Sequence, residues 1–309
     1  MPSRVCIAVA RPDYALGARR TLIAVWAGAA VVLVGAVVLR LIGVAPLATH
    51  PIDYSPIVLV ALGLLVSFVG EHARSILGMG YGTTVTGVLV ALGLDPHMVV
   101  PAVLLLGILP ASIDVGSYGW SDPSVPSPTR RLIGMGVIIA VAGMVGAVFG
   151  AWGALSLSGP ALSGVIAAVL LAVGVLAAIE GRVSFRPLKG RVAAVVLGLV
   201  AGAGRGLMGG AYGPVLGSLD IDTEDSKTTT RAVLALPELL SCAAALAVFG
   251  IPASPPLWNL IGGLMVGSLV VKMLSALPVP PPAVEVARAV TAVGTIVLAG
   301  LLTLSTAAY

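Results

Sequence analysis

The sequence predicts an all-α integral membrane protein with an inverted repeat. Each copy is expected to be a broken, re-entrant helical hairpin followed by three transmembrane helices, with one extra helix at the N-terminus. Three observations lead to this fold class. The chain of 309 residues is 58% hydrophobic and only 10% charged, whereas a soluble domain is about a quarter charged. Apolar runs of membrane-spanning length recur along it, and one glycine-rich motif occurs twice.

The apolar runs set the expected helices. An uninterrupted run that crosses about 30 Å of hydrocarbon needs roughly 20 residues at 1.5 Å per residue. Such runs cover residues 21–43, 98–116, 132–155, 161–179, 229–250, 257–274 and 286–306. The first of them is too long for the core of a signal peptide, so we expect an uncleaved helix.

Two longer runs, 56–94 and 191–219, contain the repeated motif. Residues 74–82 read R-S-I-L-G-M-G-Y-G, and residues 205–213 read R-G-L-M-G-G-A-Y-G. Closely spaced glycines weaken a helix and allow close backbone approach. We therefore expect each run to form two half-helices joined by an unwound turn. Irregular backbone at membrane depth is tolerated only where it is buried in protein or lines a wet cavity.

Basic residues indicate whether each broken run crosses the membrane or returns. If both runs are hairpins and the N-terminus is cytoplasmic, then all but three of the 17 Lys and Arg residues lie on the cytoplasmic side. The exceptions are Arg40, expected outside, and the two arginines in the breaks. If each run crossed once, Arg130, Arg131 and the basic residues of 182–191 would move outside. The positive-inside rule therefore favours hairpins.

The hairpin topology predicts an inverted repeat. Each copy then crosses the membrane three times, so the second copy is inverted and its hairpin enters from the opposite face. The two motifs can then meet near the midplane, related by an approximate two-fold axis in the membrane plane. The expected organisation is a cytoplasmic tail and extra helix in 1–50, one repeat in 51–185 and a second in 186–309, with the C-terminus outside.

Arg74 and Arg205 are the strongest candidates for binding an anion. An arginine at the centre of a membrane helix costs about 2.5–3.5 kcal/mol. Its guanidinium keeps its charge and forks onto oxyanions, and N–H groups freed at a helix break add positive potential. The expected substrate-binding residues are Arg74, Gly78, Gly80, Tyr81, Gly82, Thr83, Arg205, Gly209, Gly210, Tyr212 and Gly213. Thr84 and Thr86 are further hydroxyl donors.

Acidic residues near the breaks leave a second interpretation open. Glu71 lies three residues before Arg74, and Glu238 lies deep in the run 229–250. Each is able to pair with an arginine and hold two helices together. A buried carboxyl also takes up a proton more readily than one in water, which suits proton transport. Glu71, His72 and Glu238 are therefore expected to act as counter-ions or in proton coupling.

Other classes of site are not indicated. The two cysteines and three histidines form no disulfide framework and no metal-ligand spacing, so no metal or cofactor is expected. No nucleophile–base pair that would indicate an enzyme is visible. The net charge of +4 is explained by basic cytoplasmic loops rather than by nucleic acid. The expected partners are a small anion and the lipid bilayer, and a homodimer is open.

The motifs resemble those of the sulfite exporter TauE/SafE family. The matching stretches are I-L-G-M-G-Y-G with A-L-G-L-D-P-H, and L-M-G-G-A-Y-G with the later T-T-T-R-A. The resemblance covers roughly residues 56–307. The family's break is commonly G-x-G-G-G, and here Tyr81 and Tyr212 replace a glycine. The resemblance implies a secondary transporter for sulfite, organosulfonates or related sulfur-containing anions.

The sequence thus predicts a cell-membrane exporter of a small sulfur-containing oxyanion, sulfite or an organosulfonate. Alternating access would come from one repeat rocking against the other, and proton coupling is open. Two alternatives remain: a passive anion channel with the same site, and a membrane scaffold subunit that transports nothing and whose arginines only hold helices together.

Overall fold

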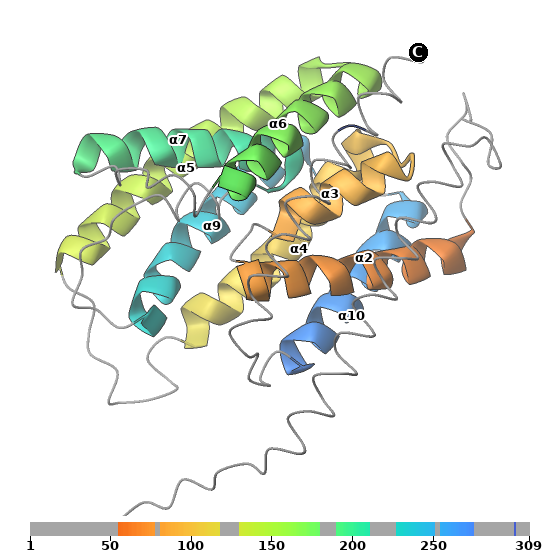
Figure 1. The fold of residues 1–309 in the computed structure, drawn as a ribbon, viewed down its shortest axis with the longest axis horizontal. Helices are drawn as coiled ribbons and strands as arrows, with labels where there is room; N and C mark the ends of the chain where they lie inside the picture. The colour runs from red at the N-terminus through yellow and green to blue at the C-terminus, as the bar shows by residue number, and fades with distance from the viewer. Residues whose placement is uncertain are drawn as a thin grey trace, which may run out of the picture. The chain divides into compact units, whose positions relative to one another are not determined.

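A computed structural model of the chain describes residues 55–77, 81–117, 130–179, 190–210, 227–250, 254–274 and 300. By backbone contacts the chain divides between Leu47 and Ala48, and every described residue belongs to the second unit. All regular secondary structure in the described part is helical (Figure 1). The all-helical prediction is therefore confirmed there, while the three predicted domains stay predictions.

Eight helices are described, and their bounds follow the apolar runs closely. They are α2 (Pro56–Leu77), α3 (Tyr81–Ala91), α4 (Pro96–Ser117), α5 (Arg130–Ser156), α6 (Gly159–Ile179), α7 (Arg191–Met208), α9 (Lys227–Phe249) and α10 (Pro255–Leu274). The helices expected at 21–43 and 286–306, and the second half of the run 191–219, lie outside the described residues. Within the described residues, Leu132–Ser156 and Arg191–Met208 are long and apolar enough to cross a membrane.

Local sequence explains where these helices begin and end. Gly93 has a positive φ of 90° and closes the turn after α3. Asp95 then caps α4, because its Oδ1 accepts a hydrogen bond of 3.0 Å from the backbone N–H of His97, and Pro96 occupies the first helical position. Gly209, with φ of 70°, ends α7 in the left-handed region that glycine adopts without strain.

Helices α5 and α7 pack backbone to backbone through small residues. A Cβ added to Gly202 of α7 would lie 2.8 Å from the carbonyl carbon of Gly143 in α5, and one added to Gly150 would lie 3.0 Å from the Cα of Ala203. Successive residues of α5 contact successive residues of α7 in the same sequence direction, so the two helices run parallel. Small residues give such close approach in membrane proteins, where dispersion contacts drive helix association.

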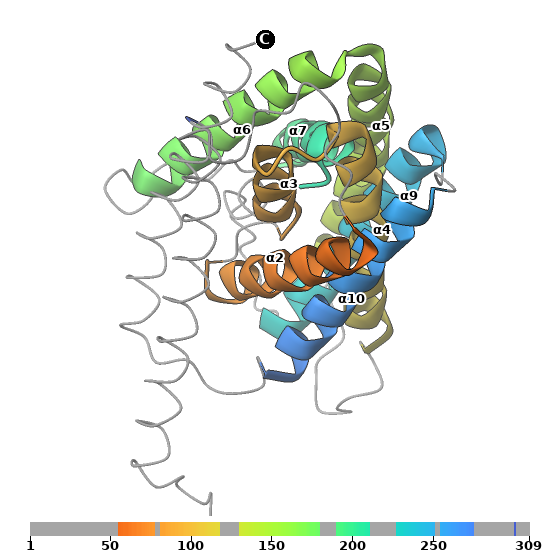
Figure 2. The same ribbon diagram turned by 90° about the vertical axis from the view of Figure 1, so that its right-hand side faces the viewer.

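Helices α2 and α10 pack in the same way. A Cβ on Gly63 would lie 2.8 Å from the carbonyl oxygen of Leu260, and a Cβ on Gly263 would lie 2.9 Å from the Cα of Val60. Further along, the Glu71 carboxylate of α2 accepts a hydrogen bond from Ser268 of α10. The pair is therefore also parallel, and it lies side by side in both Figure 1 and Figure 2.

One cluster of buried apolar residues links three helices. Its members come from α4, α5 and α9 and include Val100, Leu104, Ala147, Ala151, Cys242 and Ala245. In contrast, large apolar side chains on the outer faces of α5 and α7 are exposed, among them Val141, Phe149 and Trp152. Exposed apolar faces of this extent suit a lipid environment rather than water.

Candidate functional site

The first broken run is two helices that fold against each other. Helix α2 ends at Leu77 and α3 begins at Tyr81. A Cβ on Gly70 would lie 2.6 Å from Cγ2 of Val85, although 15 residues of continuous helix would separate them by roughly 22 Å. The chain therefore reverses direction between α2 and α3. Gly78 and Gly80 lie in the intervening stretch, outside the described residues.

The backbones of the two breaks touch. A Cβ added to Gly82, at the start of α3, would collide with the Gly209 carbonyl group at the end of α7, and would lie 2.9 Å from the Cα of Gly210. A Cβ on Gly210 would in turn lie 2.8 Å from the Cα of Thr83. Glycine is required on both sides because only a residue without Cβ permits such an approach. We call this contact the glycine junction.

A buried hydrogen bond closes the glycine junction. The Thr86 hydroxyl of α3 donates to the backbone carbonyl of Met208, the last residue of α7, over 2.7 Å. This carbonyl belongs to the helix end that lacks an intrahelical donor. The N-terminal end of α3 thus meets the C-terminal end of α7, so the opposite partial charges of the two helix ends face each other.

Arg205 lies in the last turn of α7, one turn before the glycine junction, and is only 2% exposed. Its Nη2 donates to Oε1 of Glu238 in α9 over 2.6 Å. Its Nη1 donates to the carbonyl oxygen of Gly209 over 3.1 Å. The charged group thus holds the end of α7 and a second helix together.

The surroundings of this ion pair are asymmetric. The Arg205 side chain is 3% exposed and that of Glu238 is 22% exposed. Gly107 of α4 lies against the guanidinium, since a Cβ there would lie 3.4 Å from Nη1. Glu238 follows Pro237, which interrupts the hydrogen bonding inside α9. Three helices therefore converge on Arg205, and only its partner reaches an accessible surface.

A second polar group lies on α2, α3 and α10. Glu71 is 3% exposed, and its Oε1 accepts a hydrogen bond of 3.0 Å from the Ser268 hydroxyl. Ser67 donates to the carbonyl oxygen of Leu264 over 2.7 Å, and its Oγ lies 2.8 Å from the Tyr81 hydroxyl. Since a serine has one proton to donate, Tyr81 is the donor of that last bond.

The structure brings together part of the site expected from sequence. Gly82, Thr83, Gly209 and Gly210 meet at the glycine junction, and Arg205 binds Glu238 beside it. The Tyr81 hydroxyl lies 2.8 Å from Oγ of Ser67. The backbones of His72 and Arg74 lie in α2, but their side chains lie outside the described parts, as do Tyr212 and Gly213.

Several contributors escaped the sequence analysis. Gly107 and Cys242 adjoin each other on facing helices, and Ser67 and Ser268 supply the polar contacts between α2 and α10. One indication of Ser67 was available in the sequence, namely its spacing. It lies four residues after Gly63 and therefore on the same face of α2. Among the described residues, no group of three His, Cys, Asp or Glu side chains is placed to hold a metal ion.

Comparison with protein families gives a match over most of the chain. Residues 59–302 match the family described as sulfite exporter TauE/SafE. Neither the curated proteins nor the solved structures provide a match. The family is an integral membrane family of transporters, not enzymes, and membership implies transport of sulfur-containing anions. With its helical architecture and its family match over residues 59–302, this chain belongs to the sulfite exporter TauE/SafE family.

Proposed function

We propose that this protein is a secondary transporter that exports sulfite or an organosulfonate, and that Arg205 binds the anion. Family membership supports a membrane transporter of sulfur-containing anions. The single observation that carries the finer proposal is the buried Arg205–Glu238 ion pair beside the glycine junction. Arg74 and the remaining residues of the two breaks complete the proposed site.

The carboxylate of Glu238 is itself an oxyanion bound to the guanidinium. Its Oε1 accepts a hydrogen bond from Nη2 of Arg205 at a distance of 2.6 Å. Sulfite and sulfonate groups also present oxygen atoms that accept charge-assisted hydrogen bonds from arginine. Glu238 therefore marks the position that a substrate oxygen would take when the carboxylate moves away.

Substrate binding then requires an exchange of partners. Arg205 cannot lose its charge, and a buried charge without a partner is costly. The anion must accordingly replace Glu238 as the carboxylate withdraws. Glu238 is the more exposed of the two, at 22%, so it is the group able to take up a proton as it leaves. This exchange would couple anion export to proton movement.

Reciprocal packing supports the proposed inverted repeat. In each copy the first helix of the hairpin packs in parallel on the second spanning helix of the other copy. Helix α2 of the first copy packs on α10 of the second, and α7 of the second copy packs on α5 of the first. The first spanning helices, α4 and α9, contact each other through Gly107 and Cys242. A two-fold axis between the copies would produce this pattern. Rocking of one repeat against the other would provide alternating access, with the N-terminus cytoplasmic and the C-terminus outside.

The experiment compares Arg205→Gln, Glu238→Gln and the double variant in liposomes, by sulfite, sulfoacetate, sulfate and chloride flux. Replacing a whole ion pair by neutral groups is often tolerated, whereas removing one partner is not. We expect the double variant to recover the thermal stability that the single variants lose, yet to carry no sulfite. Arg205→Lys is the matched control, because it keeps the charge and loses the fork, and should retain part of the flux.

The two alternatives predict different results. If the ion pair only staples helices, as in a scaffold subunit, the wild type moves none of the anions. If Arg205 is a staple in a transporter whose site lies elsewhere, the folded double variant transports like the wild type. A passive channel carries sulfite without any response to a proton gradient, and this independence survives in Glu238→Gln.

A further inference from the structure

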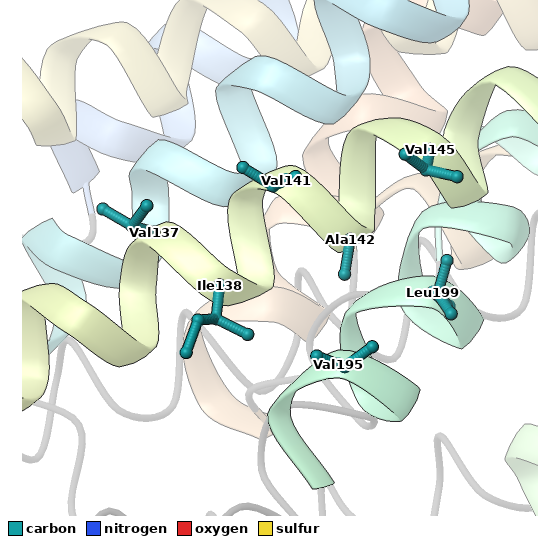
Figure 3. A pocket seen from close by; sticks show the side chains of 7 residues that line it. All are labelled: Val137, Ile138, Val141, Ala142, Val145, Val195 and Leu199. Atoms are coloured by element: carbon teal, nitrogen blue, oxygen red, sulfur yellow. The ribbon is translucent and has the colours of Figure 1, made fainter. Parts of the chain in front are cut away.

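Helices α5 and α7 form an apolar groove on the outer face of the bundle, distinct from the ion pair and the glycine junction. It measures about 470 Å³. The lining side chains include Val137, Ile138, Val141 and Val145 of α5 and Val195 and Leu199 of α7 (Figure 3). All are aliphatic, and Val137, Val141 and Val145 are each between 44% and 53% exposed.

The groove has the length of an acyl layer. From Val137 to Val145 it extends eight residues along α5, which corresponds to roughly 12 Å at 1.5 Å per residue. One leaflet contributes about half of the roughly 30 Å hydrocarbon thickness. An acyl chain lying along the groove would thus be covered over most of its leaflet.

An arginine stands on each helix at the same end of the groove. Arg130 begins α5 and Arg191 begins α7, and both are exposed. Since α5 and α7 run parallel, their first residues lie at the same end of the pair. Both arginines also continue the faces that line the groove, because Arg130 precedes Val137 by seven residues and Arg191 precedes Val195 by four.

We infer that the groove binds an anionic phospholipid. Its acyl chain would lie against the valines of α5 and α7, and its phosphate would lie between Arg130 and Arg191. The inference goes beyond the proposed function, because it uses none of the residues assigned to the substrate. An apolar groove with cationic groups at one end suits a lipid with an apolar chain and an anionic headgroup. A zwitterionic lipid would gain less binding free energy from the two arginines.

Native mass spectrometry of the purified protein tests this site with phosphatidylglycerol and phosphatidylcholine of identical acyl chains. We expect preferential retention of phosphatidylglycerol. Each arginine near the membrane surface should contribute roughly fivefold to that preference, so Arg130→Gln with Arg191→Gln should abolish most of it. Val141→Trp should block retention of both lipids at this site, while Val266→Trp, at a position 50% exposed on α10, should not.

The outcomes decide the proposal. Unchanged preference in the double arginine variant, or unchanged retention in Val141→Trp, overturns it. Conversion of a dimer to a monomer by Val141→Trp, with lipid retention unaffected, assigns the groove to a second copy of the chain and also overturns it. All four substitutions lie at exposed positions or helix starts, so size-exclusion chromatography suffices to check that each variant is folded.

Discussion

Adding one methyl group at Gly82 should break the glycine junction. In Gly82→Ala the new Cβ would lie 2.5 Å from the carbonyl carbon of Gly209 and 2.9 Å from the Cα of Gly210. Ordinary contacts between carbon atoms are about 3.5–4.0 Å. Both obstructing groups are backbone, so α3 and α7 would have to separate by about 1 Å. That movement would also lengthen the 2.7 Å hydrogen bond from Thr86 to Met208 beyond useful range.

The magnitudes set the direction of the effect. Alanine in place of a helical glycine gains about 0.5–1 kcal/mol from the unfolded state. Overpacking costs about 1–3 kcal/mol, and loss of a buried hydrogen bond that leaves the carbonyl without its donor costs about 1–3 kcal/mol. The losses exceed the gain, so Gly82→Ala should be destabilised by about 1–5 kcal/mol and should lose sulfite flux.

The matched control is Gly134→Ala on α5. Gly134 is exposed, and within the described part of the chain an added Cβ would have no atom within 4 Å other than its chain neighbours and the backbone of its own helix. This variant should melt at or slightly above the wild-type temperature and keep its flux. The assay is thermal unfolding in detergent, followed by sulfite flux in liposomes. If Gly82→Ala has the same melting temperature as Gly134→Ala and transports sulfite equally well, then the two breaks do not make this close contact.

Three further predictions concern the ion pair, the junction and the topology. Glu238→Gln should lower the free energy of unfolding by about 3 kcal/mol, since Arg205 loses its charged partner. The variant should nevertheless bind sulfite more tightly, and its flux should no longer respond to a proton gradient. Weaker sulfite binding in calorimetry contradicts the exchange of partners. Thr86→Val should destabilise by about 1–3 kcal/mol in thermal unfolding, because the Met208 carbonyl loses its donor. A single cysteine placed in 181–190, in a cysteine-free background, should react only with reagents that reach the cytoplasm, and labelling from outside refutes the predicted topology.

The sequence predicted the helices well, because each long apolar run in lipid must satisfy its own backbone hydrogen bonds. For that reason the run 132–155 corresponds to α5, Arg130–Ser156, within two residues at either end. The interruption in 56–94 was also predictable, since three glycines at alternating positions weaken a helix. Contacts between side chains that are distant in the sequence were harder to predict. The Ser268 partner of Glu71 is 197 residues away, and no local pattern connects them.

The sequence by itself determined the membrane class, the helix positions, the resemblance to a transporter family and the two arginines worth examining. All of these follow from hydropathy, glycine placement and the cost of charge in lipid, which are local properties of the chain. Only the tertiary structure decided that Gly82 meets Gly209 and that Arg205 binds Glu238 at 2.6 Å. Those contacts depend on how α3, α7 and α9 approach one another, and backbone proximity between distant segments is set by packing rather than by any single segment.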